Sequence, residues 1–66
     1  MPPKYPNVQV ELIGQDGNAL MILGTVGKAL RRAGVPPEEI TRFHDEATKG
    51  DYDHLLGVCM KWVDVV

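Results

Sequence analysis

The chain has 66 residues, a single cysteine (Cys59) and a formal net charge of −2. This length accommodates one domain, and a lone cysteine excludes an intramolecular disulfide. The slight acidic excess argues against a protein that binds nucleic acids nonspecifically, because phosphate neutralisation supplies most of the affinity in that class.

The sequence lacks the signals of a secreted or membrane protein. No basic segment followed by an apolar segment marks a signal peptide. The longest apolar run extends from Ala19 to Leu23, whereas a membrane crossing needs about 20 residues. A lone cysteine in an apolar run fits a reducing compartment. We therefore expect a cytoplasmic protein that makes no contact with a membrane.

The first element is a strand that follows a proline-rich beginning. Three of the first six residues are proline, which predicts a flexible N-terminal arm over residues 1–6 and one domain over residues 7–66. From Val8 to Ile13 the residues alternate, with Val8, Val10 and Leu12 on one face. This period of two predicts a half-buried strand.

A turn and a long helix come next. Glycines and polar residues at positions 14–18 are typical of a turn, and Asn18 is suited to cap a helix. From Ala19 the period becomes helical, and Gly34 stands where a helix ends. The predicted apolar stripe comprises Ala19, Ile22, Leu23, Val26, Ala29, Leu30 and Ala33.

Two shorter helices and a second strand complete the predicted elements. Pro37 and two glutamates open a helix with a thin apolar stripe (Ile40, Phe43 and Ala47) that ends by Gly50. Asp51 caps a third helix over residues 52–60, whose predicted core face is Tyr52, Leu55, Leu56 and Cys59. The β-branched and aromatic tail, residues 62–66, predicts a short strand.

These elements predict a small α+β domain in the order β-α-α-α-β, with the two terminal strands paired against a layer of three helices. The pattern leaves open whether the strands run parallel or antiparallel. A two-stranded sheet has two open edges, which can pair with another chain, so a homodimer is one expected form.

Two glycines in the first helix require an explanation, because each costs about 1 kcal/mol relative to alanine. Gly24 and Gly27 lie off the apolar stripe and form a smooth face. Such a face accepts a close neighbour, which is either another helix of this chain or a partner. We favour the neighbour within the chain.

The residues that could carry catalysis or bind a metal do not have the required spacing. The densest group combines two histidines with four carboxylates, but it matches neither a zinc site nor a calcium loop: His44, Asp45, Glu46, Asp51, Asp53 and His54. Apolar neighbours would raise the pKa of the Cys59 thiol rather than activate it. We expect no catalytic site, no metal and no cofactor.

Two sets of residues are candidates for binding. Trp62 and Tyr52 belong to the residue types enriched at binding hot spots, although Trp62 also suits the core. Lys28, Arg31 and Arg32 form a small basic cluster that could contact phosphate, but complementing the negative end of the helix dipole is the simpler interpretation.

Several blocks of the sequence resemble a group of short bacterial and phage proteins that has no assigned function. The resemblance extends from about Val8 to the C-terminus and implies a free-standing unit, such as an accessory protein of a mobile element. It carries over no functional residue. The blocks are residues 14–19, 29–35, 50–56 and 60–63, of which 50–56 is the most specific.

Taken together, the sequence predicts a non-enzymatic module that acts through protein–protein contact, with an unidentified protein or a second copy as its partner. The alternative is a regulator that associates with nucleic acid through Lys28, Arg31 and Arg32. Nucleic acid is the less favoured partner on the charge balance.

Overall fold

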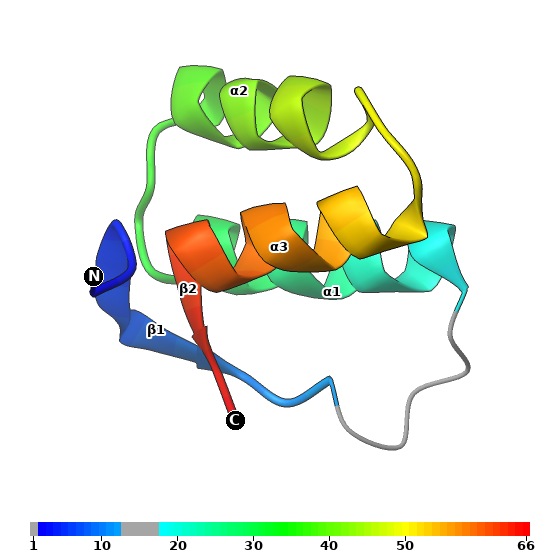
Figure 1. Cartoon of the computed structure of the whole chain (residues 1–66). Helices are drawn as coiled ribbons and strands as arrows, with labels where there is room; N and C mark the ends of the chain where they lie inside the picture. The colour runs from blue at the N-terminus through cyan, green and yellow to red at the C-terminus, as the bar shows by residue number, and fades with distance from the viewer. Residues whose placement is uncertain (1, 13–17) are drawn as a thin grey trace.

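The computed structural model describes residues 2–12 and 18–66. The chain forms strand β1 (Tyr5–Val10), helices α1 (Ala19–Arg32), α2 (Pro37–Ala47) and α3 (Tyr52–Trp62), and strand β2 (Val63–Val65). The predicted α+β order is therefore confirmed. Figure 1 shows α2 on one side of α1 and α3, and the sheet on the other side.

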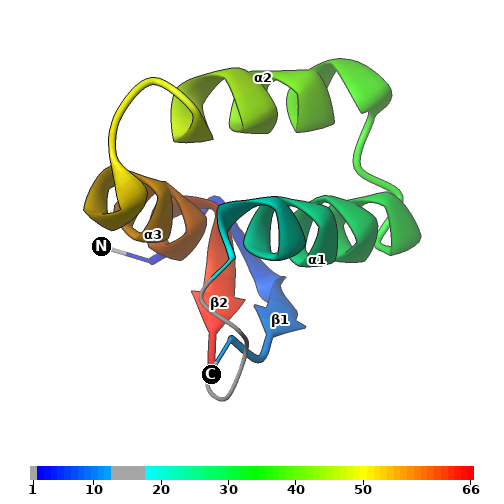
Figure 2. The same ribbon diagram turned by 90° about the vertical axis from the view of Figure 1, so that its right-hand side faces the viewer.

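The two strands pair in parallel, which the sequence pattern left open. The three helices carry the chain back between the two strands, as parallel pairing requires. Figure 2 shows the sheet beneath α1 and α3, so that these helices cover one face of the sheet. No helix in the described part of the chain combines the length and the apolar character that a membrane crossing requires.

β1 occupies a different stretch from the predicted strand over residues 8–13. It begins at Tyr5, so Tyr5 and Pro6 lie in the strand and not in the expected N-terminal arm. The strand register is irregular between Tyr5 and Gln9, and a strand tolerates a proline at such a bulge. β1 ends at Val10 because its partner strand stops at Val65. Ile13 lies outside the described residues, as do positions 14–17 of the turn predicted at 14–18.

The helices begin and end where local chemistry favours it. Asn18 accepts a hydrogen bond from the Leu20 amide (2.9 Å), and Asp51 accepts one from the His54 amide (2.9 Å). α1 ends at Arg32, and Gly34, just beyond the helix, has a φ of 85°, in the left-handed region that favours glycine. α3 continues through Trp62, two residues beyond the predicted end, so β2 begins only at Val63.

The core lies between the helices and above the inner face of the sheet. Phe43 of α2 and Val26 and Leu30 of α1 are fully buried. Val8 and Val10 point inward from β1, as their alternation predicts. α3 contributes a face that differs in part from the predicted one, because Tyr52 is exposed whereas Val58 and Trp62 are buried. That face consists of Leu55, Val58, Cys59 and Trp62.

Candidate functional site: a groove between β1 and α1

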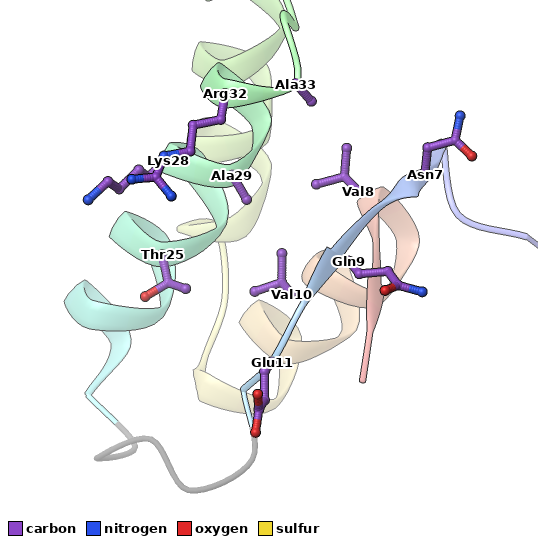
Figure 3. Close-up of a pocket in the computed structure, with 10 residues that line it drawn as sticks. All are labelled: Asn7, Val8, Gln9, Val10, Glu11, Thr25, Lys28, Ala29, Arg32 and Ala33. Carbon is purple, nitrogen blue, oxygen red and sulfur yellow. The ribbon is translucent and has the colours of Figure 1, made fainter.

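An open groove lies between the unpaired edge of β1 and the side of α1. Its volume is about 640 Å³. Figure 3 shows Val8 and Val10 pointing from β1 into this space and Ala29 pointing into it from α1, while Gln9 points away. The groove therefore has an apolar floor and polar rims. Its lining comprises Asn7, Val8, Gln9, Val10 and Glu11 from the strand side and Thr25, Lys28, Ala29, Arg32 and Ala33 from the helix side.

The backbone of β1 presents hydrogen-bonding groups to this groove. The Val66 amide donates to the Val10 carbonyl (2.9 Å), so the backbone groups of Val10 face β2. Backbone groups alternate between the two edges along a strand, so those of Gln9 face the other edge. The sheet has the order β1-β2, and no other strand of the described residues covers that edge. The Gln9 amide and carbonyl are thus placed to pair with an added strand.

Charge is distributed unequally along the groove. Lys28 and Arg32 are four residues apart on α1 and therefore share one face of the helix. Arg32 lies toward one end of the groove in Figure 3, and Glu11 lies at the other end. None of these three side chains forms an ion pair within residues 2–12 and 18–66. The groove therefore has a basic end and an acidic end, both without an intramolecular counter-ion in this part of the chain.

The structure divides the predicted basic cluster between two sides of α1. Lys28 and Arg32 border the groove beside β1. Arg31 and Lys28 border a separate hollow between α1 and α2, which His44 also lines. All three cations are exposed. Lys28 lies between the two hollows, and only Arg32 accompanies it at the groove.

The two aromatic candidates lie at opposite ends of α3 and are not brought together. Trp62 is only 5% exposed and packs on Tyr5 (ring centroids 5.9 Å apart) and on Phe43 (5.8 Å). A ring in this position cannot anchor a partner without leaving the core, so the core interpretation of Trp62 holds. Tyr52 is 40% exposed and borders a hollow of about 240 Å³ at the start of α3.

A polar cluster fixes the beginning of β1 and was not predicted from the sequence. The Lys4 ammonium pairs with the Glu39 carboxylate and lies 4.4 Å from the Trp62 ring centroid. The Tyr5 hydroxyl donates to the same carboxylate (3.2 Å). The hydrogen bond from Lys4 holds the pKa of Glu39 below its ordinary value, helped by the hydrogen bond from Tyr5 and by the positive charges of Lys4 and Arg42. Burial, and then the hydrogen bond to Glu39, raises the pKa of Tyr5.

The glycine face of α1 has an intramolecular neighbour at one of its two positions. Gly27 is buried, and a Cβ atom there would lie 3.0 Å from the His44 Nε2 atom. At Gly24, no atom of the described residues lies within 4 Å of the corresponding point. The expected neighbour within the chain is therefore α2, through the His44 ring, at Gly27 alone.

The histidines and the cysteine occupy structural positions. A ring nitrogen of His54 lies 2.8 Å from the Glu46 carbonyl oxygen and so ties the start of α3 to the end of α2. Burial raises the pKa of Cys59 to about 11, so its thiol stays protonated near neutral pH. Within the described residues, no three His, Cys, Asp or Glu side chains are grouped to hold a metal ion.

Comparisons of the chain with protein-family models, curated proteins and solved structures find no significant match.

Proposed function

We propose that this protein is a small non-enzymatic binding module that accepts an extended segment of a partner protein in the groove between β1 and α1. The segment would add a strand to the open edge of β1. One observation carries the proposal. The backbone of Gln9 faces the open edge of β1, and α1 lies beside this edge across a groove with an apolar floor. Strand addition of this kind takes its affinity from backbone hydrogen bonds and its selectivity from the side chains that line the groove.

β1 is a better template for an added strand than β2. It has six residues, whereas β2 has three. The β1 edge is also bordered by α1, which provides a wall against which alternate side chains of the added strand can pack. A segment in this groove would gain both backbone hydrogen bonds and apolar burial, whereas a bare edge offers the hydrogen bonds alone.

The resemblance to short bacterial and phage proteins is compatible with such a module. The biological setting that the resemblance suggests is an accessory protein of a mobile element. That setting remains a prediction.

The test is a selection from a displayed library of random linear peptides on the immobilised full chain. Strand addition predicts that the selected peptides bind native protein and lose binding to Gln9→Pro, because proline removes the outward amide. Edge positions tolerate proline, so circular dichroism should show that the variant keeps its helices. The matched control is Gln9→Thr, which keeps the backbone amide but removes the carboxamide of the side chain. This variant should keep binding.

A second measurement does not depend on the stability of the proline variant. Amide chemical-shift changes on adding a selected peptide to native protein should concentrate in β1 and along residues 25–33 of α1. Equal binding to native protein and to a folded Gln9→Pro variant would contradict strand addition. Shift changes confined to other surfaces would contradict the groove itself.

The alternative function, association with nucleic acid, makes a different prediction about the basic residues. It needs Lys28, Arg31 and Arg32 together, so Arg31→Glu and Arg32→Glu would weaken retention on an oligonucleotide equally, with a steep dependence on salt. The groove proposal predicts that Arg31→Glu leaves peptide binding unchanged, because Arg32 lines the groove and Arg31 does not. The two variants therefore separate the two functions.

A further inference from the structure

We infer that the segment bound in this groove is acidic, with Asp or Glu side chains facing Lys28 and Arg32 and alternate apolar side chains facing the floor. This inference rests on the proposed function and specifies the chemistry of the partner. The partner is then a protein with an extended segment. In this segment apolar residues occupy every second position, and one end carries Asp or Glu.

The charge distribution supports an acidic occupant. Lys28 and Arg32 lie on the helix rim, are exposed and form no ion pair within the described ranges, 2–12 and 18–66. The protein nevertheless has a net charge of −2, so the positive charge of this rim is opposite in sign to the net charge of the protein. Carboxylates placed beside it would gain attraction, and a basic segment would meet like charges. Glu11 at the opposite end favours a segment that carries no carboxylate there.

The floor determines which other side chains the segment presents. Val8, Val10 and Ala29 face the groove. Side chains of a strand alternate between its two faces, so every second residue of an added strand would point toward this floor. Those residues would be apolar, because the floor has no polar side chain for them to bond.

The test uses peptides fused through their C-termini to a display scaffold, so that side chains alone supply carboxylates. Selection on native protein should enrich alternating apolar sequences with Asp or Glu at one end. Synthetic copies with capped termini should lose at least about tenfold in affinity when Lys28→Glu and Arg32→Glu are combined, because two attractive pairs become repulsive. Selection on that double variant should enrich Lys or Arg instead.

The matched control combines Arg31→Glu with Lys49→Glu. It changes the net charge by the same amount, and both positions are exposed and outside the groove. Acidic peptides should lose less than about threefold in affinity on this variant, since distant charges are screened at physiological salt. An equal loss on both double variants would attribute the effect to overall charge and overturn the inference.

The remaining outcomes separate this inference from the proposed function. Peptides that map to the groove without enrichment of Asp or Glu would overturn the acidic preference and leave strand addition standing. Failure to recover any peptide that maps to the groove would overturn both. A dimer in solution with the Gln9 amide protected from exchange would overturn the acidic occupant in favour of a second copy.

Discussion

The two ends of β1 differ in the contacts that they make with the rest of the protein. At its beginning, Tyr5 stacks on Trp62, and Lys4 and Tyr5 both bond to Glu39 of α2. At its end, the backbone of Gln9 faces an open edge, beside charged side chains that form no ion pair with any other described residue. The first end is anchored by contacts with α2 and α3, whereas the second is accessible. The difference indicates that stability resides at the beginning of β1 and binding at its end.

The largest effect is expected from a substitution that disrupts the packing at the anchored end of β1. Phe43→Ala removes a fully buried ring that contacts Trp62, so the free energy of unfolding should fall by about 3–5 kcal/mol in urea denaturation. The control Met60→Ala removes an apolar side chain that is 64% exposed and should change stability by less than about 0.5 kcal/mol. Similar losses in both variants would contradict the assignment of the core.

A glycine pair extends the comparison between packed and open surfaces to α1. Gly24→Ala should raise the free energy of unfolding by about 0.5–1 kcal/mol, because alanine favours the helix and its methyl group would clash with no described residue. Gly27→Ala should give a smaller gain, since its Cβ meets His44 at 3.0 Å. Adding His44→Ala should remove this difference. A gain for Gly27→Ala equal to that of Gly24→Ala in native background would show that the His44 ring moves without cost.

The ion pair at the anchored end should make stability depend on pH. The folded-state pKa of Glu39 is lowered below its ordinary value of 4.5, first by the Lys4 hydrogen bond. Its contribution is therefore complete above that pH and is lost as the pH falls through the folded-state pKa. Glu39→Gln should flatten the decline in stability below about pH 4.5, measured by urea denaturation at several pH values. An unchanged decline would assign the acid sensitivity to other carboxylates.

The smallest expected effect concerns the stability of the groove end. Lys28→Ala and Arg32→Ala should each change the free energy of unfolding by less than about 0.5 kcal/mol, because both side chains are exposed and neither forms an ion pair with another described residue. A loss above about 1 kcal/mol in either variant would mean that these residues support the fold and would weaken their assignment to binding.

The sequence predicted the helices better than the sheet. The stripe through Ile22, Val26 and Leu30 indicated α1 because burial on one helix face imposes a regular period. The start of β1 was misplaced because prolines usually interrupt strands, and the bulge that accommodates Pro6 depends on a partner strand more than 50 positions away. The parallel direction depends on the path of three helices, which no local pattern encodes.

The groove was only half predictable. The alternation of Val8, Gln9 and Val10 indicated an inward and an outward face, and an open edge was expected of any two-stranded sheet. The position of Lys28 and Arg32 beside this edge could not be predicted, because it depends on the tertiary packing of α1 against β1. Trp62 could not be assigned from its residue type, because core and binding surfaces both favour tryptophan.

The most direct test of strand addition is amide hydrogen exchange at Gln9, with and without a selected acidic peptide. In the free protein the Gln9 amide faces the open edge and should exchange rapidly, while the Val66 amide, bonded to the Val10 carbonyl, should exchange more slowly. With the peptide at saturation, Gln9 should become at least about tenfold slower, because an added strand accepts its hydrogen bond. A Gln9 amide that exchanges at the same rate with the peptide bound would contradict strand addition at β1.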